Sequence, residues 1–93
     1  MRAVVNRVEL KEPIPDEAFD VSALVDKARA IEGFGSIQMI RLEDSLVLII
    51  TGDDDAAIGR IRDGVGNDWM RENVIPHAAG PTDRHVGDLV VSI

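Results

Sequence analysis

The chain has 93 residues, a formal net charge of −7 and a hydrophobic fraction of 45%. This length fits a single domain over residues 1–93, and folding at this size buries only about 60–65% of the surface of the unfolded chain. Because cysteine is absent, disulfides, thiolate metal sites and cysteine nucleophiles are excluded. Ten lysines and arginines stand against seventeen acidic residues, and no basic cluster is present, so we expect no nucleic-acid partner.

The distribution of apolar residues along the chain bears on the cellular location of the protein. No apolar run is long enough to cross a bilayer, so we expect no membrane partner. Residues 1–7 contain two arginines and an asparagine where a signal peptide would need a continuous apolar stretch. We therefore expect a cytoplasmic protein.

The first predicted strand spans residues 3–10, in which side chains alternate between two faces. Val4, Asn6 and Val8 share one of these faces. Two prolines then keep the chain extended, because proline fixes its own backbone angle and disfavours helix in the preceding residue. Apolar residues at helical spacing between 21 and 31 predict an amphipathic helix, which Asp20 or Ser22 would cap and Gly33 would end.

Two further strands are predicted at residues 36–42 and 46–51, and the polar break Glu43-Asp44-Ser45 between them suits a hairpin. Residues 46–50 are apolar on both faces of the pleat. Such a strand must be covered on both sides, by helices on one and by a second sheet on the other. Together with the small size of the chain, this predicts a homodimer that pairs through its sheet faces.

A second helix is predicted after the run Asp53–Asp55, whose carboxylates can accept the free backbone N–H groups at its start. The run lacks the spacing of a calcium loop, which favours capping over metal binding. Gly64 and Gly66 interrupt this helix, and Pro76 ends the segment that follows. With a last strand at residues 86–93, the order becomes β-α-β-β-α-β, an α+β ferredoxin-like fold with an antiparallel sheet.

Three segments carry a resemblance to a known family: the turn Glu32-Gly33-Phe34, the strand Ile37–Arg41 and the strand-to-helix junction Gly52–Ala57. With the order of elements, they resemble the dimeric α/β-barrel superfamily, and antibiotic biosynthesis monooxygenase-like proteins are the nearest branch. The resemblance implies that two sheets face each other in a dimer. It also implies a cavity between each sheet and its own helices.

Asn6, Trp69 and His77 are the candidate catalytic residues. Asn6 is the polar residue on an apolar strand face, where its amide has either a structural hydrogen-bond partner or a ligand. Trp69 is either packing within the core or a cavity wall. His77 is either a solvated loop residue or a group for proton transfer or ligation. The alternation of the first strand and the position of the second helix predict that Asn6 and Trp69 line one cavity.

The resemblance implies a monooxygenase without a cofactor, which binds or oxidises a small aromatic molecule. Asn6 and Trp69, with Arg62 or His77, would then stabilise the anion of a phenol or quinol. The chain has no tyrosine, so a tyrosine hydroxyl plays no part. The alternative is a non-catalytic ligand-binding or stress-responsive dimeric module.

A third interpretation is haem binding. Asn6, Trp69 and His77 are similar to the Asn, Trp and His set of haem-degrading monooxygenases, in which the histidine binds the iron. Two features depart from that family: Pro76 directly precedes the candidate ligand, and an acidic chain offers few cations for the propionates.

Overall fold

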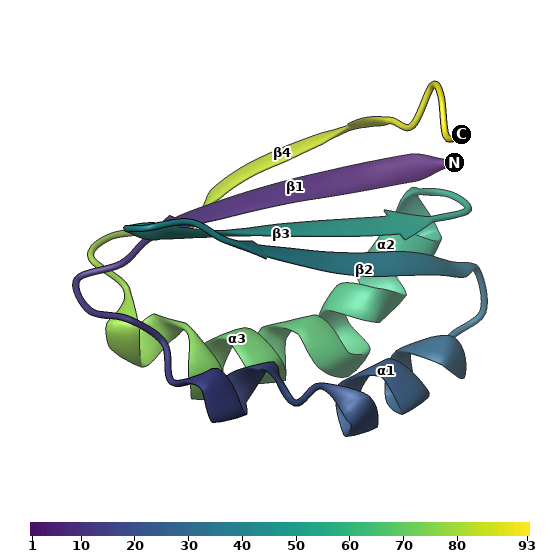
Figure 1. Cartoon of the computed structure of the whole chain (residues 1–93). Helices are drawn as coiled ribbons and strands as arrows, with labels where there is room; N and C mark the ends of the chain where they lie inside the picture. The colour runs from purple at the N-terminus through teal and green to yellow at the C-terminus, as the bar shows by residue number, and fades with distance from the viewer.

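A computed structural model describes residues 1–93 as a sheet with all of its helices on one face (Figure 1). The strands are antiparallel in the order β2-β3-β1-β4. The predicted α+β ferredoxin-like fold is therefore confirmed. The regular elements are β1 (Arg2–Glu9), α1 (Ser22–Arg29), β2 (Phe34–Arg41), β3 (Ser45–Gly52), α2 (Asp55–Ile61), α3 (Asn67–Asn73) and β4 (Asp83–Asp88).

The turn between α1 and β2 depends on Gly33, whose φ angle of 85° lies in the left-handed region that the sequence predicts. A Cβ atom at this position would lie 2.7 Å from the Cβ of Ala57, so the turn also packs tightly against α2. The expected cap of α1 is wrong, because Val21 occupies that position without a side-chain bond. Ser22 instead donates to the carboxylate of Asp20 at 3.1 Å.

The start of α2 has the acidic cap that the sequence predicts. Asp54 is the N-cap residue, and its Oδ1 atom accepts a hydrogen bond from the backbone N–H of Ala57 at 2.8 Å. This bond satisfies one of the free donors in the first turn. Capping by the acidic run is therefore confirmed.

Replacing Asp54 with alanine should lower the free energy of unfolding by about 1 kcal/mol, because the N–H of Ala57 loses its acceptor. Urea denaturation followed by circular dichroism measures this loss. Asp53→Ala is the matched control, since the side chain of Asp53 makes no hydrogen bond within the chain. Equal losses in the two variants would contradict a capping role specific to Asp54.

The second helix does not restart at a new angle after its glycines. Instead, α2 continues into α3 through the π-helical turn Arg62–Gly66, where the N–H of Asn67 bonds to the carbonyl of Arg62. α3 then ends at Asn73, and Pro76 lies in a short 3₁₀ turn beyond it. The predicted interruption therefore falls at the expected residues, but it takes the form of one wide turn.

Two clusters of buried side chains fill the space between the sheet and the helices. The first lies under the centre of the sheet and contains Val4, Ala28, Leu48, Ile50, Ile58, Ile61 and Val65. The second lies towards the start of α1 and contains Val8, Ile14, Leu46, Trp69 and Val74. In both, the sheet residues come from one face of β1 and β3, as the alternation of polarity requires.

The opposite face of the sheet is covered by no helix (Figure 1). Strand β3 is apolar on this side too: Leu48 on the helix side is buried, whereas Val47 and Ile49 on the open side are half-buried. Val5 and Ile40 add apolar area there, with 38% and 45% of their surface exposed. The second sheet expected to cover this face stays a prediction.

The last strand differs from its predicted range of 86–93. β4 spans Asp83–Asp88, and its register with β1 pairs Asp88 with Arg2. Beyond this pair, the backbone N–H of Leu89 donates a hydrogen bond to the carbonyl of Met1. The register with β1 does not include the residues after Asp88, and Val90 and Val91 are 85% and 67% exposed. No helix of the protein is both long and apolar enough to span a membrane.

Candidate functional site

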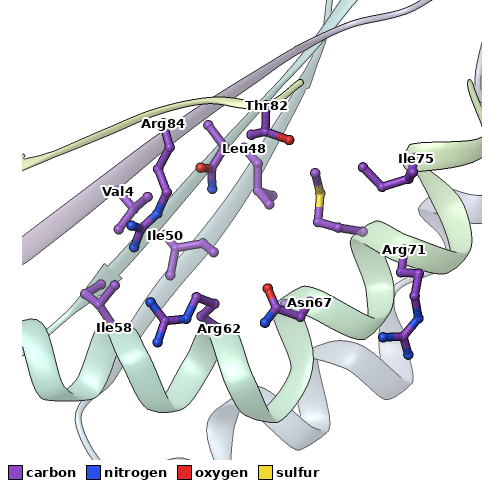
Figure 2. A pocket seen from close by; sticks show the side chains of 13 residues that line it. Val4, Leu48, Ile50, Ile58, Arg62, Asn67, Arg71, Ile75, Thr82 and Arg84 are labelled. Atoms are coloured by element: carbon purple, nitrogen blue, oxygen red, sulfur yellow. The ribbon is translucent and has the colours of Figure 1, made fainter. Parts of the chain in front are cut away.

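A cavity of about 440 Å³ lies between the sheet and the continuous helix formed by α2 and α3 (Figure 2). Its floor is apolar, because Val4, Leu48, Ile50 and Ile58 each expose no more than 7% of their surface. Its remaining wall carries amides, a hydroxyl and guanidinium groups. The residues around it are Val4, Asn6, Leu48, Ile50, Ile58, Arg62, Gly66, Asn67, Met70, Arg71, Ile75, Thr82 and Arg84.

Asn6 lies on the wall of this cavity. It pairs with Leu48 of β3 on one side and with Arg84 of β4 on the other, so these three side chains form a row across the sheet. Side chains of directly paired residues point to the same face. The carboxamide of Asn6 makes no hydrogen bond within the chain, which leaves its donors and its acceptor free for a bound molecule.

Trp69 lies outside this cavity. It is 9% exposed and packs in the second cluster, with its ring centroid 6.4 Å from that of Phe19. Met70 is the neighbour that lines the cavity, because adjacent side chains on a helix point about 100° apart. The expected cavity shared by Asn6 and Trp69 is therefore wrong, and Trp69 has the core-packing position that was the alternative.

His77 lies in a third place, in a shallow hollow beside Pro15 and Glu72. Its Nδ1 atom is 2.9 Å from a carboxylate oxygen of Glu12, and 22% of its side chain is exposed. Asn6, Trp69 and His77 therefore do not converge on one space. This arrangement does not fit a haem held by His77, and no group of three His, Asp or Glu side chains could hold a metal ion.

Sequence reasoning named Arg62 but missed Arg71 and Arg84, the other two arginines of the cavity. Arg84 was missed because the last strand was predicted to begin at residue 86. In a strand that begins at residue 83, the alternation of side chains places Arg84 and Val86 on the face of the sheet that the helices cover. Arg71 follows Met70 on α3, where an exposed arginine carries no signal of its own.

The three arginines differ in their partners. Nε of Arg62 is 3.0 Å from the carboxylate of Asp63, and this hydrogen bond lowers the pKa of Asp63. A guanidinium nitrogen of Arg71 is 2.7 Å from the carboxylate of Asp68. Arg84 has neither an ion pair nor a side-chain hydrogen bond in the chain.

Scans against protein-family models and curated proteins find no match for this sequence. Solved structures do resemble it. A protein of unknown function from Nitrosomonas europaea superposes with a TM-score of 0.77 at 15% identity, over 99% of this chain and 91% of that chain. SnoaB, a cofactor-independent oxygenase from Streptomyces nogalater, superposes with a TM-score of 0.70 at 18% identity, over 99% and 95%.

A third structure, a putative antibiotic biosynthesis monooxygenase from Nitrosomonas europaea, gives a TM-score of 0.69 at 10% identity over 98% of this chain and all of that one. The expected resemblance is therefore confirmed at the level of fold. The chain has the ferredoxin-like fold of antibiotic biosynthesis monooxygenase-like proteins, with a half-apolar cavity between the sheet and its second helix.

Proposed function

We propose that this protein is a cofactor-independent monooxygenase that takes a small polycyclic phenol or quinol into the cavity beside Asn6. The observation that carries the proposal is the free carboxamide of Asn6 above a floor of buried aliphatic side chains. An aromatic ring would displace water from the floor, and an amide N–H would hold the oxygen that becomes charged. The fold shared with SnoaB, a cofactor-independent oxygenase, supports this assignment.

The proposed reaction oxidises a ring CH₂ in the keto form of the phenol. Loss of one proton gives an anion with its charge shared between oxygen and carbon. The carbon gives its electron pair to O₂ and forms a C–O bond. The second ring hydrogen then leaves as a proton while the O–O bond breaks, which yields a ring carbonyl and water. One oxygen atom enters the product, the other enters water, and no external reductant is needed.

The ionisable side chains around the cavity are all arginines, which stay protonated in water. No Asp, Glu, His or Lys lies there to accept the substrate proton, so the proton must pass to solvent. The protein would then act by holding the anion, which Asn6 does by donating from its side-chain nitrogen. Activity should follow the ionisation of the substrate as pH rises, without a falling limb from a protein acid.

Replacing Asn6 with alanine should lower the rate of oxidation about a hundredfold, the usual effect of removing one donor to a developing oxyanion. Oxygen uptake with anthrone as substrate, in metal-free buffer, measures this rate. Asn73→Ala is the control, because Asn73 bonds to the carbonyl of Trp69 outside the cavity. Equal rates in wild type and Asn6→Ala would contradict the role of Asn6.

The second candidate is a ligand-binding module without catalysis. The observation that favours it is the lack of a proton acceptor around the cavity, since an enzyme that removes a proton usually supplies one. Saturable binding of anthrone without oxygen uptake above that of buffer would select this candidate.

We further propose that two copies pair through the open sheet faces. The half-buried Val47 and Ile49 would be fully covered there, together with Val5 and Ile40. Burying this apolar area would add stability to a chain whose small size limits the core that it can form alone. The cytoplasmic location stays a prediction from the N-terminal sequence.

A further inference from the structure

We propose that the natural ligand of this cavity is an aromatic acid, whose carboxylate binds to Arg84 while its rings lie on the apolar floor. This inference rests on the cavity of the proposed function and adds the substrate class. It does not depend on whether oxidation follows binding.

The charge of the cavity opposes the charge of the chain. The protein carries a net charge of −7, yet three arginines and no acidic residue line this space. Positive potential at one site of an acidic protein attracts anions to that site and keeps them from the rest of the surface. The ligand that fits is therefore negatively charged when it binds.

Arg84 is the arginine available for that charge. Arg62 and Arg71 each have a carboxylate neighbour within 3.0 Å, but Arg84 has none. Figure 2 shows the side chain of Arg71 directed away from the floor, whereas Arg84 extends along it past Val4. A guanidinium without a partner offers two parallel N–H donors that match the two oxygens of a carboxylate.

Arg62 on the helix and Arg84 on β4 both place their guanidinium groups at the same end of the cavity (Figure 2). An anion bound at this end of the cavity would be attracted by both positive charges. Arg62 keeps Asp63 as its partner through Nε, so its contribution is the smaller one. An acid group bound to Arg84 is therefore also attracted, more weakly, by Arg62.

The depth of the cavity sets how the ligand would lie. The floor residues Leu48 and Ile50 are buried, whereas Arg84 is exposed and the side chain of Arg62 is 49% exposed. A carboxylate at this end would stay partly hydrated, which avoids most of the cost of burying an ion. The rings would meanwhile remove the apolar floor from water. The ligand thus binds with its acid group outward.

Two probes of matched shape test the inference: 2-naphthoate, which is an anion, and 2-naphthamide, which is neutral. Neither carries a phenol, so neither can be oxidised by the proposed reaction. Isothermal titration calorimetry of the wild type should show naphthoate binding at least about tenfold more tightly than naphthamide, the effect of one charge-assisted hydrogen-bonded pair. Added salt should reduce this preference.

Arg84→Gln should abolish the preference for naphthoate and leave the affinity for naphthamide unchanged. Arg62→Gln should reduce the preference, and Arg29→Gln should keep it, because Arg29 lies on α1 outside the cavity. Equal binding of both probes to the wild type would overturn the inference, as would a preference that survives Arg84→Gln or binding of neither probe. Heteronuclear NMR spectra of each variant establish that the fold is intact.

These outcomes are separable from those of the proposed function. A preference for naphthoate without oxidation of anthrone would uphold the acid site and contradict the monooxygenase. Oxidation of anthrone with equal binding of the two naphthalene probes would do the reverse.

Discussion

Replacing Leu48 with aspartate should unfold the protein. Leu48 is 4% exposed, lies on the helix face of β3, and belongs to the larger of the two buried clusters. Aspartate at this position would lose the apolar contacts and bury a carboxylate that has no cation beside it in the cluster. The cost is several kcal/mol, which is comparable with the total stability of about 5–15 kcal/mol typical of a domain.

Circular dichroism and urea denaturation measure this effect. Leu42→Asp is the matched control: it makes the same change of side chain at a position that is 42% exposed, just beyond β2. We expect the control to unfold at nearly the wild-type concentration of urea. A Leu48→Asp variant with a cooperative transition near that of the wild type would show that β3 is not central to the core.

Replacing Ile49, the next residue along β3, with glutamate should have a different result: a folded monomer. Ile49 lies on the open face, where it is half-buried in the single chain. A charge there would be buried between two sheets in the proposed dimer but solvated in the monomer. We expect the dissociation constant of the dimer to rise at least about a hundredfold, while the far-ultraviolet circular dichroism stays that of the wild type.

Sedimentation equilibrium at micromolar concentration separates the two states. Ala56→Glu serves as the control, since it adds a charge on the exposed surface of α2, away from the sheet. A wild type that sediments as a monomer would contradict the proposed dimer. A dimeric Ile49→Glu variant would place the contact on another surface.

The sequence predicted most of the fold because each element has a local cause that no distant contact overrides. The alternation of apolar side chains predicts which side of β1 faces the helices. Gly33 predicts a turn with a left-handed residue, and Asp54 predicts the start of α2. The last strand was placed three residues late, because the apolar tail resembles a strand as strongly as residues 83–88 do. The register with β1 includes residues 83–88 and leaves the apolar tail unpaired.

The candidate site was predicted less well. Alternation sufficed for Asn6, since a strand has only two faces. A helix can direct a side chain anywhere around its axis, and the sequence does not say which side of α3 leans towards β4. Trp69 was therefore predicted to line the cavity, whereas its neighbour Met70 does so. Two of the three arginines of the cavity were not predicted, because an arginine considered alone has the pattern of a solvated side chain.

The π-helical turn Arg62–Gly66 holds one residue more than an α-helical turn does. Because five residues close a turn there that four close in an α-helix, deleting one of them would restore the α-helix and leave every later side chain pointing in nearly its present direction. Trp69 would stay against Phe19 and Met70 would stay at the cavity, whereas a deletion within α2 that kept the π turn would rotate both side chains by about 100°. The chain can thus lose a residue at this turn and keep the wall of the cavity, which is not true of a deletion elsewhere in the helix.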